Sequence, residues 1–284
     1  MITGGGTVET SLNFVRKKYS SFLYYYVIIV ILTSLSWFVQ FHLSIKQWMI
    51  KIFESIPSFC LIQSFGFGKV DGLGHTWYLS SMMIVIFILT PILLKWPKIF
   101  SLYVAPVLSI LLISHMQKTE FAGSLTGLIR AFAEISLGCT CYYIVESGIL
   151  KKLNKNLLSI IALICYSVSL VLMFGNRGTS MLIETIIFLA VAVAITFYNT
   201  ETFKFLNNKF IFFLGKLSLP IYLCQILCIS VIRKYIVGLN LSVYVYVVVC
   251  LLCVIVVAAV CMFAGDGLRK LCNKMLFKKS EVAA

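Results

Sequence analysis

The chain has 284 residues, of which 61% are hydrophobic and 12% are charged, and its mean hydropathy is +1.00. Soluble domains carry about 45–50% apolar and about 25% charged residues, so a soluble fold could not cover this much apolar surface. A net charge of +14 would suggest nucleic-acid binding in a soluble protein. Here the basic residues lie in short loops between apolar runs, which is typical of membrane-topology signals, and we expect no nucleic-acid partner.

Hydrophobic stretches of about 20 residues recur along the chain, and a helix of that length crosses the roughly 30 Å hydrocarbon core of a bilayer. Lipid cannot satisfy free backbone groups, and the long apolar runs lack the short alternating segments of a membrane barrel. The sequence therefore predicts an all-α fold, a polytopic transmembrane helical bundle with about eight spans. We expect one membrane-embedded domain over residues 1–284, with spans near 20–42, 77–94, 99–115, 125–145, 157–174, 179–198, 211–232 and 241–264.

The longest connection between spans covers residues 43–76. Trp48, Phe53 and Phe59 recur in it at helix-like spacing, which predicts a helix lying at the membrane interface. A cluster of glycines over residues 66–74 is expected to break that helix before the second span begins.

Lys and Arg residues are unevenly divided between the two sides of the predicted bundle. Fifteen fall on the side of the chain ends and seven on the other side. Cytoplasmic loops carry the positive excess, so we expect a multi-pass plasma membrane protein with both termini in the cytoplasm. Most of the ten cysteines lie inside apolar runs, and we interpret them as small packing residues without a metal site.

Arg130 and Glu134 lie inside one span, a single helical turn apart. An Arg at the centre of a span costs about 2.5–3.5 kcal/mol on insertion scales, so it should face the bundle and have a partner. Two interpretations stay open: a structural ion pair that orients one helix, or a polar wall of a substrate cavity.

His75 and Trp77 lie where the chain enters the second span. Trp77 is typical of an interfacial belt, and His75 is most simply a histidine in a solvated loop. No Ser, Cys or second His is spaced to complete a catalytic triad or a metal site. Further along, Pro220 can open a helix near a site, and Tyr222 and Gln225 would need polar partners inside the bundle.

Three segments, His75–Leu79, Arg130–Glu134 and Leu214–Leu223, carry a resemblance to a known family. Together they resemble the acyltransferase 3 family of membrane O-acyltransferases, which modify sugars on surface polysaccharides and other glycans. The first is similar to the family's H-x-W-F-L segment and the second to a mid-family helix. The third, which reads L-G-K-L-S followed by I-Y-L, is the most specific, and the resemblance extends over nearly the whole chain.

The resemblance implies that an acyl group, such as acetyl, passes from acyl-CoA to a hydroxyl of a cell-surface or lipid-linked carbohydrate. Acyl-CoA (acetyl-CoA) is then a co-substrate, and no cofactor is bound permanently. Arg16, Lys17 and Lys18 resemble the family's basic segment before its third span and face the side where they could contact coenzyme phosphates, although a cluster that only fixes topology explains them equally well. The candidates for a substrate pocket are Trp77, Arg130, Glu134, Tyr222 and Gln225.

Two departures from the family pattern bear on activity. Tyr19 stands where a second Arg is expected, and Gln225 stands where many relatives have a His. The family's first span also carries an Arg followed about three turns later by the His implicated in acyl transfer, and this chain has no such helix. The resemblance therefore implies an N-terminally incomplete family member, without the first one or two spans and with little or no transfer activity. His75 could replace the missing base only if the site opened outward.

Two other functions stay open on the sequence alone. A transporter or flippase for a glycan or lipid would use Arg130 and Glu134 to line a pathway, but the inverted repeats typical of that class are not visible. A non-catalytic membrane scaffold is the other alternative. The sequence gives no oligomeric state.

Overall fold

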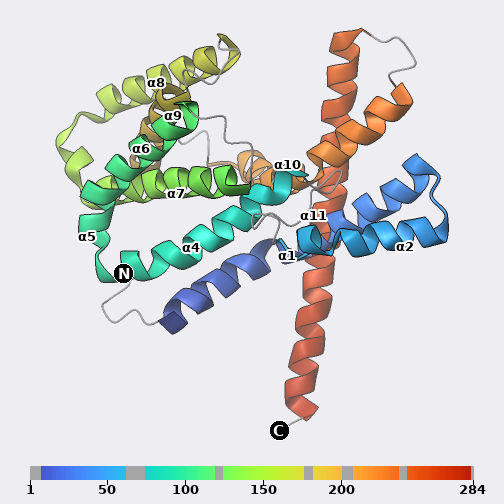
Figure 1. Ribbon diagram of the computed structural model, residues 1–284. Coiled ribbons are helices and arrows are strands. Elements are labelled where there is room, and N and C mark those ends of the chain that lie inside the picture. The colour runs from blue at the N-terminus through green and yellow to red at the C-terminus, as the bar shows by residue number, and fades with distance from the viewer. Residues whose placement is uncertain are drawn as a thin grey trace. The chain divides into compact units, whose positions relative to one another are not determined.

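A computed structural model of the protein describes residues 8–61, 74–118, 124–175, 182–199, 207–236 and 242–282. Within these ranges every regular element is helical (Figure 1). Seven of the described helices are long and apolar enough to cross a membrane, and the shorter apolar helix Ile183–Tyr198 supplies an eighth candidate. The protein is therefore a polytopic helical membrane protein, which confirms the predicted fold class.

The described helices follow one another along the chain as α1 (Val8–Phe41), α2 (Ile45–Glu54), α3 (Ile56–Phe59), η2 (Gly74–Thr76), α4 (Trp77–Lys95), α5 (Pro97–Ile99), η3 (Phe100–Val104), α6 (Ala105–Lys118), α7 (Ser124–Glu146), η4 (Ile149–Lys152), α8 (Lys155–Gly175), α9 (Leu182–Tyr198), α10 (Lys209–Ile236) and α11 (Val243–Val282).

Helices α1 and α11 are longer than the spans predicted from hydropathy. α1 begins at Val8 and not near residue 20, and α11 continues to Val282, well beyond residue 264. Hydropathy marks only the apolar part of a helix, whereas Lys, Arg and Glu are good helix formers and let the helix continue into polar sequence. These two helices are therefore longer than their apolar segments, and the bounds of the membrane-crossing parts stay a prediction.

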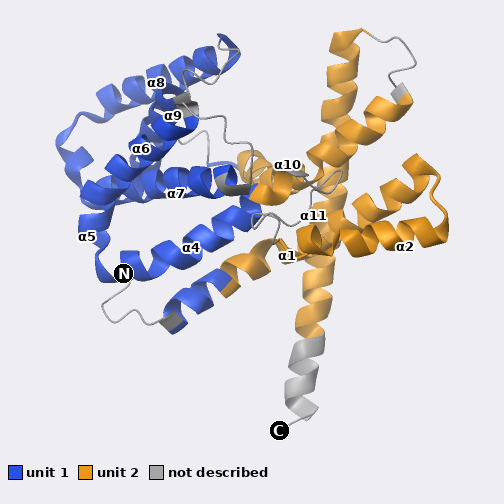
Figure 2. Ribbon diagram, viewed as in Figure 1, with its two compact units in different colours: residues 1–15, 78–208 blue, residues 16–77, 209–284 orange. Residues whose placement is uncertain are grey.

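The chain divides into two compact units (Figure 2). Unit 1 comprises residues 1–15 and 78–208, and unit 2 comprises residues 16–77 and 209–284. Unit 1 thus contains helices α5 to α9 with most of α4. Unit 2 contains most of α1 together with α2, α3, η2, α10 and α11.

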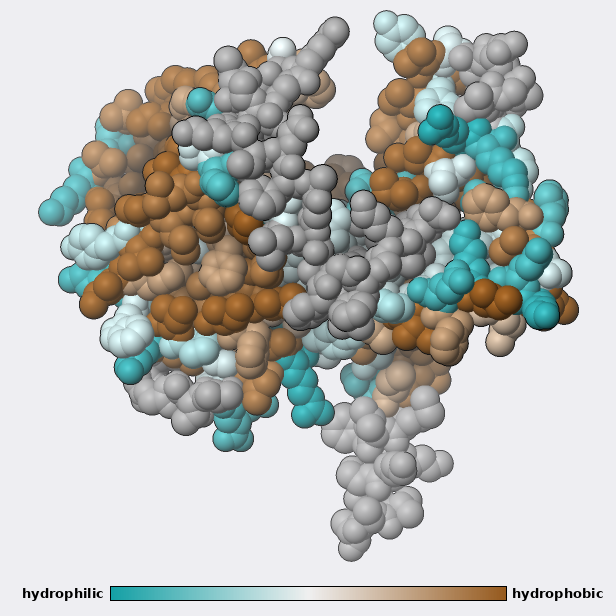
Figure 3. All heavy atoms as spheres, in the orientation of Figure 1, coloured by the Kyte–Doolittle hydropathy of each residue, from teal (hydrophilic) through white to brown (hydrophobic). Residues whose placement is uncertain are grey.

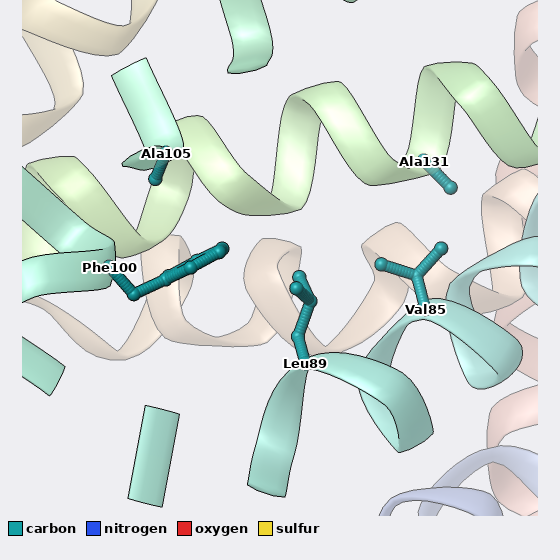
Figure 4. Close-up of a cluster of buried hydrophobic side chains, with 5 residues drawn as sticks. All are labelled: Val85, Leu89, Phe100, Ala105 and Ala131. Atoms are coloured by element: carbon teal, nitrogen blue, oxygen red, sulfur yellow. The ribbon is translucent and has the colours of Figure 1, made fainter. Parts of the chain in front are cut away.

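Unit 1 is held together by apolar side chains that pack against small residues. Val85 and Leu89 point from α4 toward Ala131 of α7, and Phe100 of η3 lies beside them (Figure 4). Ala131 has no exposed surface, and a side chain this small lets neighbouring helices approach closely. Figure 3 shows that the outward surface of this unit is largely hydrophobic in the view drawn, as a lipid-facing surface requires.

Polar side chains join the helix pairs of unit 1. The Ser109 hydroxyl of α6 lies 2.8 Å from the carbonyl oxygen of Ala133 on α7. The Asn199 side-chain amide, just after α9, donates to the Lys155 carbonyl oxygen at 2.9 Å and to the Ser159 hydroxyl at 2.8 Å, both on α8. Interhelical hydrogen bonds of this kind replace the hydrophobic driving force that helices lose in lipid.

In unit 2, α10 packs along α11 through small buried residues. Cys224, Ala258 and Cys261 have no exposed surface, and the Cys224 thiol lies 3.6 Å from the Val254 carbonyl oxygen. All ten cysteines are among the described residues, and none of them forms a disulfide. The prediction that the cysteines of the apolar runs act as packing residues is confirmed for this pair of helices.

α1 and α11 meet closely at one point of unit 2. The Tyr25 hydroxyl donates to the Asp266 carboxylate at 2.7 Å. Beside it, a Cβ atom added at Gly265 would clash with the Tyr25 ring and would lie 3.3 Å from the Tyr25 backbone nitrogen. Only a glycine allows this approach, so the hydrogen bond and Gly265 together fix where the two helices meet.

Helix α2 confirms the helix predicted after the first span, and its contacts place it along α1. The Trp48 indole donates to the Ser34 carbonyl oxygen at 2.8 Å, and the Tyr26 hydroxyl donates to the Ser58 carbonyl oxygen of α3 at 2.5 Å. Tyr26 precedes Phe41 by about 22 Å of helix, so α2 and α3 run back beside α1 from its C-terminal end (Figure 1). Their position in the bilayer stays a prediction, and most of the glycine cluster at 66–74 lies outside the described residues.

Candidate functional site

His75 lies in η2, the short helix that leads into α4, and it contacts α10. Its Nε2 atom is 3.2 Å from the Leu223 carbonyl oxygen. The Tyr222 hydroxyl donates to the His75 carbonyl oxygen at 2.5 Å, and the two rings meet edge to face with centroids 5.2 Å apart. Two residues far apart in the sequence therefore hold each other in place within unit 2.

The hydrogen bonds of His75 determine where its ring carries a proton. A carbonyl oxygen can only accept, so Nε2 must be the protonated nitrogen that donates to Leu223. Nδ1 is then the basic nitrogen, and it is buried without a hydrogen-bond partner among the described residues. Burial lowers the pKa of His75 from 6.5, and the carbonyl oxygens of Leu223 and Tyr222 oppose part of that shift. At neutral pH the ring is neutral and Nδ1 can accept a proton.

A second group of polar side chains lies between His75 and α1. Thr76 is fully buried and its hydroxyl bonds to that of Tyr26, which in turn donates to the Ser58 carbonyl oxygen. The Ser58 hydroxyl is buried and, like Nδ1 of His75, has no partner in the described part of the chain. We call Tyr26, Ser58, Thr76, His75 and Tyr222 the His75 cluster.

The arrangement contradicts one sequence-based expectation for His75. The sequence predicted a histidine in a solvated loop, but His75 is half-buried and its neighbour Thr76 bonds to Tyr26, in the middle of α1. The prediction was wrong because η2 folds against α10 and does not project into solvent. The need of Tyr222 for a polar partner is confirmed, and that partner is His75.

The other candidates on η2, α4 and α10 lie close to this cluster in the chain. Trp77 follows Thr76 directly and is half-buried at the start of α4. Gln225, also half-buried, follows Tyr222 by three residues and lies on the same face of α10. Pro220 is fully buried inside α10, which continues through it, so the helix is not opened there.

Arg130 and Glu134 form the expected ion pair in unit 1. Arg130 Nε lies 2.7 Å from Glu134 Oε1, both on α7, and the side chains are 44% and 24% exposed. Each residue is therefore the partner of the other, as predicted. The expectation that Arg130 faces the bundle was wrong, because its side chain is exposed on α7 and reaches its partner along the same helix.

The basic residues Arg16, Lys17 and Lys18 are exposed on α1. Consecutive residues of a helix point about 100° apart, so the three side chains cannot all face one phosphate group. A ligand with phosphates at more than one position could still engage several of them. Arg16 precedes Tyr26 of the His75 cluster by about 15 Å along α1.

Sequence reasoning missed three members of the His75 cluster, namely Tyr26, Ser58 and Thr76. Tyr26 is the last of three consecutive tyrosines in an apolar run, and nothing in that run marks which one faces inward. Ser58 and Thr76 are small hydroxyl residues of a kind common at helix contacts. The Pro just before Ser58 was a weak signal. It lies in the first turn of α3, a position where Pro is common, and so marks the start of a new helix.

The comparisons with known proteins identify the family of the chain. A family model described as an acyltransferase domain matches residues 8–263, which covers α1 to α10 and the apolar part of α11. No curated protein and no solved structure matches the chain. The match spans most of the sequence and includes every member of the His75 cluster. The chain therefore belongs to the acyltransferase 3 family of membrane proteins.

Proposed function

We propose that the protein is an O-acyltransferase that moves an acyl group, such as acetyl, from acyl-CoA to a hydroxyl of a cell-surface or lipid-linked carbohydrate. The observation that carries the proposal is Nδ1 of His75, a basic nitrogen without a hydrogen-bond partner among the described residues, which can accept the proton of the attacking hydroxyl once the acceptor displaces the side chains that enclose it. Membership of the acyltransferase 3 family supplies the reaction class.

In the proposed reaction the carbohydrate oxygen attacks the thioester carbonyl carbon while His75 Nδ1 takes the hydroxyl proton. The carbon–sulfur bond then breaks, and the protonated ring returns its proton to the leaving thiolate of coenzyme A. The Leu223 carbonyl oxygen holds the ring in the tautomer with Nδ1 free. The Tyr222 hydroxyl donates to the backbone carbonyl oxygen of His75 and holds that backbone in place, so Tyr222 acts as a positioning residue.

We place the coenzyme phosphates near Arg16, Lys17 and Lys18. These residues are exposed, belong to the same helix as Tyr26, and precede it by about 15 Å, which is a reach that an extended pantetheine arm can bridge. Trp77 and Gln225, beside the His75 cluster in the chain, are proposed to contact the carbohydrate. The charges of Arg130 and Glu134 neutralise each other on α7, and we propose that this ion pair orients the helix and does not bind substrate.

We place the protein in the plasma membrane with both termini in the cytoplasm. The uneven division of Lys and Arg supports this orientation.

The proposal is tested by acyl transfer in proteoliposomes that contain the full chain. Labelled acetyl-CoA is supplied with a panel of glycan acceptors, and the wild type is compared with His75→Gln. General-base catalysis contributes about 10²–10⁴-fold, so His75→Gln should lose at least about 100-fold in rate while staying folded. His115→Gln, on an exposed residue of α6, is the matched control and should keep the wild-type rate.

Two outcomes would contradict the proposal. One is the absence of transfer by the wild-type chain to any acceptor of the panel. The other is a His75→Gln variant that transfers acetyl groups as fast as the wild type.

A further inference from the structure

One face of α10 leads from the first half of the helix to its contact with His75. Positions on this face point within about 60° of a common direction. We call it the approach face, and it consists of Phe212, Gly215, Lys216, Leu219, Tyr222 and Leu223. Its last two members are the residues that hold His75, and all of them belong to unit 2.

The exposure of the approach face falls along the helix toward His75. Its first three members are exposed, and the exposed fraction of Phe212 reaches 67%. Leu219 and Tyr222 are half-buried, and Leu223 has no exposed surface. The approach face therefore runs from the surface of unit 2 into its interior, where the His75 cluster lies.

Helix α11 packs on a different side of α10. Cys224 contacts Val254 of α11, and it points about 140° away from Leu219 in the middle of the approach face. At Gly215 the face is open, because an added Cβ atom would meet no neighbouring atom within 4 Å. A flexible chain can therefore lie along the approach face without displacing α11.

Lys216 places a positive charge on the exposed part of the approach face. Its Nζ atom lies 5.0 Å from the centroid of the Phe212 ring, which is one turn further from Leu223. The ammonium group is therefore two to three turns, or about 10–16 Å, from Leu223 along the helix. Helix α10 contains no Asp or Glu, so no carboxylate of its own helix neutralises this charge.

These features fit the acyl donor, and the inference drawn from them rests on the proposed function. Coenzyme A has a thiol at one end of its flexible pantetheine arm and a pyrophosphate at the other. We propose that Lys216 binds this pyrophosphate as a charge-assisted donor while the arm lies along the approach face, which brings the thioester to His75. Because coenzyme A carries phosphates at two positions, its 3′-phosphate can lie near the basic residues of α1.

The test is equilibrium binding by the full chain in phosphatidylcholine nanodiscs, whose lipid carries no net charge. Coenzyme A is compared with pantetheine, which has the same arm without the phosphates. Lys216→Gln should bind coenzyme A at least about 10-fold more weakly than the wild type does, because it loses a charge-assisted bond. The two proteins should bind pantetheine with the same affinity.

Two further lysine variants separate charge from folding. Lys216→Arg keeps the charge and should retain the affinity for coenzyme A. Lys234→Gln removes a lysine at the other end of α10 whose Nζ also lies near aromatic rings, 5.6 Å and 5.9 Å from their centroids, and it should bind as the wild type does.

A pair of glycine variants tests the path of the pantetheine arm. Gly215→Leu fills the open part of the approach face and should weaken the binding of coenzyme A and of pantetheine alike. Gly267→Leu, at a glycine of α11 that also has open space around it, is the matched control and should weaken neither. Unchanged binding of both ligands by Gly215→Leu would show that the arm does not lie there.

Other outcomes would overturn the role of Lys216 itself. Equal affinity of the wild type and Lys216→Gln for coenzyme A would leave Lys216 as a lysine that only extends toward a lipid headgroup at the membrane surface. Full displacement of coenzyme A by an equal concentration of inorganic pyrophosphate, or no binding of coenzyme A by the wild type, would also contradict the inference. A wild type that binds coenzyme A through Lys216 but transfers no acyl group would instead contradict the proposed function alone.

Discussion

The two units of this protein bury polar groups for different purposes. In unit 1 the buried hydroxyl of Ser109 and the amide of Asn199 bridge neighbouring helices, and their bonds serve packing. Both units also bury unpaired serine hydroxyls, which can rotate toward a carbonyl one turn away. A buried and unpaired ring nitrogen is found, in the described part of the chain, at His75 of unit 2 alone.

This difference shows that amino-acid composition alone does not predict which unit contains the candidate catalytic residue. Apolar helices with occasional polar residues make up both units, but only one of them fixes a basic atom that packing does not use. A change that disturbs packing in either unit should lower stability. A change that lowers activity without lowering stability should lie in unit 2.

The largest loss of stability is expected at the meeting point of α1 and α11. Gly265→Ala places a methyl group against the Tyr25 ring, and overpacking of this kind costs about 1–3 kcal/mol. Thermal unfolding in detergent should show a clear fall in Tm. Gly267→Ala, two residues further along α11, meets no atom within 4 Å and should leave Tm unchanged or slightly raised.

A second variant checks the cause of that loss. If the clash is with the Tyr25 ring, Gly265→Ala should cost less in a Tyr25→Ala background than in the wild type. Equal Tm values for Gly265→Ala and Gly267→Ala would show that the helices do not meet there.

Features that depend on residues close together in the chain could be predicted from the sequence, whereas contacts between distant residues could not. The number of spans, the helix after the first span and the pairing of Arg130 with Glu134 were predicted, because each follows from residues close together in the chain. His75 and Tyr222 were both singled out, but their contact was not, since 147 positions separate them. Hydropathy shows which segments enter the membrane and not which helices become neighbours.

A smaller effect is expected from the ion pair of unit 1. Arg130→Ala and Glu134→Ala should each lower the folded yield more than the double variant does, because a single change leaves one charge without its partner. Exposed pairs of this spacing couple by about 0.3–0.5 kcal/mol in water, and a double-mutant cycle measures the value here. Simple addition of the two losses would show that the residues do not interact.

The same variants sharpen the comparison between the units. Because the pair is assigned an orienting role in unit 1, kcat/KM per folded molecule should stay close to the wild-type value in all three. A selective fall in kcat/KM at equal folded yield would move Arg130 and Glu134 into the substrate site.

The central claim is that His75 accepts the proton in acyl transfer, and the pH dependence of kcat/KM tests it most directly. The base must be neutral to act, so activity is present above the pKa of His75 and is lost as the pH falls through it. Burial lowers that pKa, so the account predicts an acid limb below pH 6.5 that disappears in His75→Gln. An acid limb at or above pH 6.5, or one that persists unchanged in His75→Gln, would contradict it.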